Sequence, residues 1–93
     1  MVKIKLEDTV ERCVNHPFQK VLDETVIVDT HTRLMHALDD VGSHLWSLLV
    51  QPCKVEEIIK QVTESYDVPA RQAETDIVQF LERMRDCGLI KVK

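Results

Sequence analysis

The sequence predicts an α+β domain, with a three-stranded antiparallel N-terminal sheet followed by a three-helix bundle. Segments that alternate or are rich in β-branched residues precede residue 39, whereas apolar residues after residue 40 recur at helical spacing. Residues 33–49 join the two parts, because a predicted strand here runs directly into a predicted helix. Such a junction fixes the angle between the sheet and the bundle.

Three segments are predicted to form the sheet. Residues 25–28 are all β-branched and give the strongest strand signal in the chain. Residues 18–22 precede them, and a polar turn at residues 29–32 returns the chain into residues 33–38. The three strands therefore form a meander.

Alternation along the third strand divides its side chains between two faces. Leu34, His36 and Leu38 share one face, which we expect to pack on the helices because Leu38 leads directly into the first helix. His36 then needs a polar partner or partial exposure. The alternative assignment places Met35 in the core.

Three helices are predicted, at residues 40–50, 55–66 and 69–87. Asp39 and Asp40 are favourable N-cap residues for the first helix. Pro52 lies beyond its end, and Pro69 suits the first position of the third helix. Gly88 is the expected C′ residue that ends the third helix.

The two termini carry weaker signals. Residues 1–16 are predicted to form an N-terminal arm, in which residues 3–6 alternate as in a short edge strand. Residues 17–93 are the predicted domain, and residues 89–92 form a closing strand or tail. Ninety-three residues are enough for one core and too few for two.

Charge and composition disfavour several classes of protein. The net charge is −4, and twelve basic residues are interleaved with sixteen acidic ones, which disfavours nucleic-acid binding. No apolar run has the length of a membrane span and no signal peptide opens the chain, so we expect a cytoplasmic protein without membrane contact. Three cysteines without a CxxC pair predict reduced thiols.

No grouping of residues predicts an enzyme, a cofactor or a metal site. The four histidines lack metal-ligand spacing and are predicted to lie at the surface. Ser43 and His44 are adjacent on a helix and do not face each other. The two glycines cannot build a phosphate loop.

The element order leaves three functions open. The second and third predicted helices form a helix-turn-helix, the outline of a winged-helix fold, and a small DNA-binding regulator is the alternative function. Peptide binding fits better, because the acidic charge does not oppose it. The edge of the meander can accept an added strand, and the third helix can flank that strand. Val78 suggests such a flank, although it equally fits simple packing under the sheet. Pairing of this edge with a second copy is the third possibility.

Two stretches, LMHALDDVGSHLWSLL and KVEEIIKQVTESYDVPARQAETDIVQFLERMRDCGLI, together resemble the PqqD family of small peptide chaperones. The residues that match the family pattern are Leu38, Gly42, Leu45, Trp46, Leu49, Val55, Ile58, Asp76, Ile77, Phe80, Leu81, Met84, Gly88 and Leu89. The chain departs from it at Asp39, where asparagine is usual, and at Leu89, where members of the pyrroloquinoline quinone pathway carry tryptophan. No single motif is specific, but their order and spacing over about residues 17–92 are.

The resemblance implies a winged-helix, precursor-peptide recognition element. Such a non-catalytic adaptor binds the leader of a ribosomally made peptide and presents it to a modifying enzyme, often a radical S-adenosylmethionine (SAM) protein. The leader would add as a strand beside residues 33–38, in a cleft against the third helix. The predicted peptide-binding residues are Arg33, Leu34, Met35, His36, Ala37, Leu38, Glu74, Val78, Leu81 and Arg85.

Overall fold

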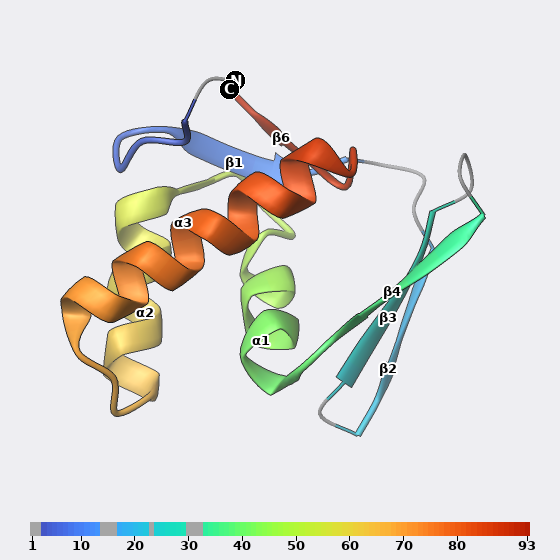
Figure 1. Ribbon diagram of the computed structural model, residues 1–93, viewed down its shortest axis with the longest axis horizontal. Coiled ribbons are helices and arrows are strands. Elements are labelled where there is room, and N and C mark those ends of the chain that lie inside the picture. Colours follow the sequence, from blue (N-terminus) through green and yellow to red (C-terminus); the bar gives the residue numbers. More distant parts are fainter. Residues whose placement is uncertain (1–2, 14–16, 23, 30–32) are drawn as a thin grey trace.

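The computed structural model describes residues 3–13, 17–22, 24–29 and 33–93 (Figure 1). The predicted turn residues 30–32 lie outside this part of the chain. The described elements are β1 (Thr9–Arg12), β2 (Phe18–Val21), β3 (Glu24–Asp29), β4 (Leu34–Leu38), α1 (Asp40–Leu48), β5 (Cys53–Lys54), α2 (Val55–Ser65), α3 (Ala70–Asp86) and β6 (Ile90–Val92). The predicted α+β class, with a meander followed by three helices, is confirmed.

Strands β2, β3 and β4 form an antiparallel sheet in that order. In its register, Ile27 lies opposite His36 and Thr25 lies opposite Leu38. These facing residues share the side of the sheet that is turned toward the helices, and Ile27 is completely buried. Figure 1 shows the meander projecting to one side of the three helices, with β4 leading into α1.

The predicted orientation of β4 is confirmed where its side chains are described. Leu38 belongs to the core, whereas Met35 is 71% exposed on the opposite face. His36 is half-buried on the Leu38 face. This agrees with the inward face that alternation predicts for His36, whereas the general prediction of surface histidines fails for His36 and for His44, which is also half-buried.

Helix α1 begins at the predicted place. The Asp39 carboxylate accepts a hydrogen bond from the Gly42 N–H at 2.8 Å, which satisfies one of the free N–H groups of the first turn. The helix is shorter than predicted, since Leu49 is already its C-cap. Leu45, Trp46 and Leu49 turn into the core.

The ends of α3 follow from one proline and one glycine. Pro69 is the N-cap residue rather than the first helical residue. At the other end, Gly88 has a φ of 77°, and the Leu89 N–H donates to the Met84 carbonyl at 2.9 Å. This is the predicted glycine-ended helix, in which the left-handed residue allows Leu89 to fold back and become fully buried.

A second sheet, in the order β5-β1-β6, was missing from the prediction. Its central strand β1 pairs antiparallel with both neighbours, so that Val10 lies opposite Cys53 on one side and Val92 on the other. The edge strand predicted at residues 3–6 is wrong, because the strand lies at Thr9–Arg12 and is central. Its partners are distant in sequence, so local alternation carries little sign of it.

Candidate functional site

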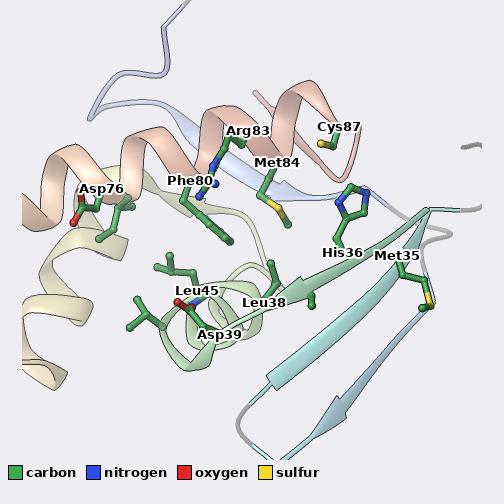
Figure 2. A pocket seen from close by; sticks show the side chains of 14 residues that line it. Met35, His36, Leu38, Asp39, Leu45, Asp76, Phe80, Arg83, Met84 and Cys87 are labelled. Carbon is green, nitrogen blue, oxygen red and sulfur yellow. The ribbon is translucent and has the colours of Figure 1, made fainter. Parts of the chain in front are cut away.

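A cleft of about 790 Å³ separates strand β4 from helix α3, with the first turn of α1 beneath it (Figure 2). Three elements therefore meet there: an edge strand, the side of a long helix and a helix start. The residues that line the cleft are Met35, His36, Ala37, Leu38, Asp39, Val41, Gly42, Leu45, Asp76, Ile77, Phe80, Arg83, Met84 and Cys87.

The backbone of β4 offers hydrogen-bonding groups to this cleft. Val28 donates its N–H to the Pro17 carbonyl at 2.8 Å, so the backbone groups of Val28 point toward β2. Neighbouring residues of a strand point their backbone groups to opposite edges, so Ile27 bonds with its partner His36 on β4. By the same alternation, the N–H and C=O groups of Met35 and Ala37 point away from β3, along the outer edge of the sheet.

Apolar side chains make the floor and the α3 wall. Leu45 and Ile77 are buried beneath the cleft, and Phe80 and Met84 extend toward it from α3 (Figure 2). Gly42 permits the close approach of Phe80, because a Cβ atom added at Gly42 would lie 3.3 Å from the Phe80 ring. The lack of a side chain at Gly42 therefore helps to shape the cleft, together with the apolar side chains.

Four polar side chains lie among the lining residues. Asp76 and Arg83 come from α3, seven residues apart and thus on one face of the helix. Asp39 and His36 come from the end and the middle of the β4 region. The Nε2 atom of His36 is buried without a hydrogen-bond partner in the described part of the chain.

The structure brings the central residues of the predicted β4 site to the cleft. Met35, His36, Ala37 and Leu38 all line it. Arg33, with a φ of 62°, lies exposed before the strand and is not among the lining residues. Leu34 belongs to β4, but its side chain lies outside the described part of the structure.

The predicted flank of α3 does not line this cleft. Glu74 and Val78 line a separate groove of about 390 Å³ together with residues 3–6. Leu81 is completely buried, and Arg85 contacts Asp86 rather than the cleft. Helical periodicity alone did not show on which side of the buried residues of α3 strand β4 would lie.

The cleft residues missed on α3 are Asp76, Ile77, Phe80, Arg83, Met84 and Cys87. Ile77 and Met84 also belong to the hydrophobic core, and Phe80 packs against it. Gly42 could have indicated one of these residues, because a glycine in the apolar face of α1 leaves room for a large side chain from another helix. Phe80 is the side chain that occupies this room.

The described residues give no sign of a metal site or a membrane-spanning helix. Within residues 3–13, 17–22, 24–29 and 33–93, no three or more His, Cys, Asp and Glu side chains gather as metal ligands would. The three cysteines are free, and Cys87 is exposed at one end of the cleft. Among the described helices, none has the length and apolar character needed to cross a membrane.

Comparisons with known proteins agree with this architecture. A solved structure described as TbiB1 in complex with the TbiA(beta) leader peptide superposes with a TM-score of 0.80 at 28% sequence identity, covering 87% of this chain and 94% of that one. A search of curated proteins found no match. The family model for coenzyme PQQ synthesis protein D (PqqD) matches residues 24–90, which include β3, β4, all three helices and the residues that line the cleft. The chain therefore belongs to the PqqD family.

Proposed function

We propose that this protein binds the leader segment of a ribosomally made precursor peptide as an additional strand on β4. The observation that carries the proposal is the free edge of β4, where the backbone groups of Met35 and Ala37 border an apolar cleft. Main-chain hydrogen bonds supply affinity in such complexes, and pockets for alternate side chains supply specificity. The leader peptide named for the TbiB1 structure supports a ligand of this class.

An added strand would use both faces of the extended sheet. Its side chains would alternate, so that every second one enters the cleft against Phe80 and Met84, and the others continue the outer face that carries Met35. Such an arrangement would hold a peptide without performing chemistry on it, and we therefore propose a non-catalytic adaptor. We further propose that the adaptor is cytoplasmic and presents its peptide to a separate modifying enzyme of the radical SAM type.

The test is a titration of the protein with the leader of the precursor peptide encoded beside its gene, followed by amide hydrogen exchange. We expect the Met35 and Ala37 amides to exchange rapidly in the free protein, because they face the open edge, and to become protected on binding. The His36 amide, which bonds with β3, should be protected in both states. Protection confined to another element, or no affinity tighter than about 1 mM, would overturn the proposal.

A further inference from the structure

We infer that the cleft selects peptides with an acidic side chain at one position of the bound strand, where Arg83 binds it. His36 supplies a second polar contact from the opposite wall. This inference rests on the strand-addition function proposed above, and it adds to that function a charge requirement on the ligand.

Arg83 is placed to bind a ligand. Its exposed side chain lines the cleft, and Figure 2 shows it extending from α3 into the space that faces β4. No ion pair to Arg83 occurs among residues 3–13, 17–22, 24–29 and 33–93. A guanidinium group presents a planar set of donors that matches a carboxylate, and beside an apolar wall their hydrogen bonds are stronger than in open water.

Arg85 provides a comparison that separates the helix-end effect of Arg83 from its place in the cleft. Both arginines lie in the last turn of α3, where a positive charge is favoured by the helix dipole. The Arg85 Nε, however, lies 3.3 Å from Asp86 Oδ1, and Arg85 is absent from the cleft lining. The two residues therefore share the helix-end effect and differ in access to the cleft.

His36 adds a second group on the β4 side. Its Nε2 atom is buried and has no hydrogen-bond partner in the described residues, an arrangement that costs free energy until a partner arrives. In Figure 2 the ring projects from β4 toward α3. A ligand carboxylate or another acceptor would satisfy this nitrogen in the tautomer that carries its hydrogen on Nε2.

The acidic residues of the cleft limit where such a carboxylate can lie. Asp76 precedes Arg83 by two helical turns, about 10 Å along the axis, and Figure 2 shows Asp76 at the end of the cleft far from His36. Asp39 adds negative charge beside the start of α1. A ligand carboxylate is thus attracted near Arg83 and repelled near Asp76. These two positions are separated by about the length of three strand residues. The order of charges would then fix the register of the peptide on β4.

A selection experiment tests this charge requirement. A random dodecapeptide phage library is panned against the full chain, the Arg83→Glu variant and the Arg85→Glu variant. We expect the wild-type chain and Arg85→Glu to enrich Asp or Glu at one fixed position among apolar residues. Arg83→Glu should lose this preference or replace it with Lys or Arg.

Affinities of single peptides complete the test. A selected acidic peptide should bind Arg83→Glu at least about tenfold more weakly than wild type, and changing its acid to Lys should restore binding to that variant. His36→Phe should weaken the acidic peptide by about threefold or more while preserving the apolar volume. Enriched peptides without an acidic preference, or an unchanged preference in Arg83→Glu, would overturn the inference and leave strand addition standing. Failure of the wild-type chain to enrich any peptide would instead count against strand addition itself.

Discussion

Phe80 and Val78 lie two residues apart on α3 and are both half-buried, yet only Phe80 lines the cleft. We expect Phe80→Ala to weaken leader binding by about tenfold or more, because it removes a large part of the apolar wall. Val78→Ala serves as the matched control and should change the affinity by no more than about twofold. Fluorescence anisotropy with a labelled leader peptide gives both values. An equal loss in the two variants would show that α3 acts through stability and not through contact.

Gly42 and Gly88 exclude a side chain for different physical reasons. A Cβ at Gly42 would meet Leu38 and Asp39 at 3.2 Å, whereas a Cβ at Gly88 would meet nothing within 4 Å but would require a positive φ. We expect Gly42→Leu to lower the free energy of unfolding by about 1–3 kcal/mol and to weaken peptide binding, because the Phe80 ring must move. Gly88→Ala should cost about 1–2 kcal/mol and leave the affinity unchanged.

Urea unfolding and peptide titration separate these two effects. Gly42→Ala is a useful intermediate, since alanine favours a helix by about 1 kcal/mol over glycine and offsets part of the crowding. Unchanged peptide affinity in Gly42→Leu would contradict the role of this glycine in shaping the cleft. Weaker binding in a folded Gly88→Ala variant would contradict the purely conformational role of the second glycine.

At the scale of elements, the edge of β4 gives the sharpest prediction. Ala37 is exposed and its N–H points away from β3, so a proline here removes no hydrogen bond of the ladder within the meander. Ala37→Pro should therefore remain folded while losing at least about tenfold in peptide affinity, because an added strand would lack this donor. Ala37→Val retains the N–H and suits a strand, so it should bind as the wild type does. Equal binding by a folded proline variant would show that the peptide pairs elsewhere.

The elements also show what the sequence could predict and what it could not. The meander and the three helices follow from residues that are near one another in the chain: β-branched runs, Asp39 as a cap and Gly88 as a stop. The β4 orientation followed from alternation, and Leu38 confirmed it. The α3 flank could not be predicted, because periodicity places Val78 and Phe80 on either side of one stripe and only the tertiary arrangement decides between them.

For the molecule as a whole, Arg12 joins the two sheets through α1. From β1, its Nε donates to the Trp46 carbonyl at 2.8 Å, and an Nη2 hydrogen bond reaches the same oxygen. The guanidinium also lies 4.6 Å from the centre of the Trp46 ring and 4.8 Å from that of Phe18 on β2. Burial lowers the pKa of the Arg12 guanidinium, but an arginine remains charged at neutral pH. One cation therefore contacts β2 and α1 from β1.

These contacts predict a measurable loss of stability when Arg12 is replaced. Arg12→Met should lower the free energy of unfolding by about 2–3 kcal/mol, because it removes hydrogen bonds from a charged donor and the contacts with two rings. Arg12→Lys should lose less, since it retains the charge but not the forked donors. Trp46, the single tryptophan, reports the transition by its fluorescence. A change below about 0.5 kcal/mol in Arg12→Met would place Arg12 with ordinary surface residues.

Strand β1 shows that residues before 17 belong to the folded core. Sequence analysis assigned residues 1–16 to an arm, yet Val10 is completely buried and Ile4 is 5% exposed within the same core as α2 and α3. Without β1, strands β5 and β6 would lose the partner that joins them. We therefore expect a chain reduced to residues 17–93 to lose cooperative unfolding, as measured by urea titration and by the dispersion of its amide resonances.

A milder variant distinguishes a missing strand from a merely shortened chain. Val10→Ala keeps the backbone pairing of β1 and removes only part of its buried side chain, so it should unfold cooperatively with a loss of about 1–3 kcal/mol. If residues 17–93 instead unfolded with the stability of the full chain, the second sheet would be an accessory and the predicted boundary at residue 16 would hold. The expected result would show that the smallest part of the chain able to fold extends beyond the matched residues 24–90. The reason is that β1, which pairs with β6 and completes the core, lies outside them.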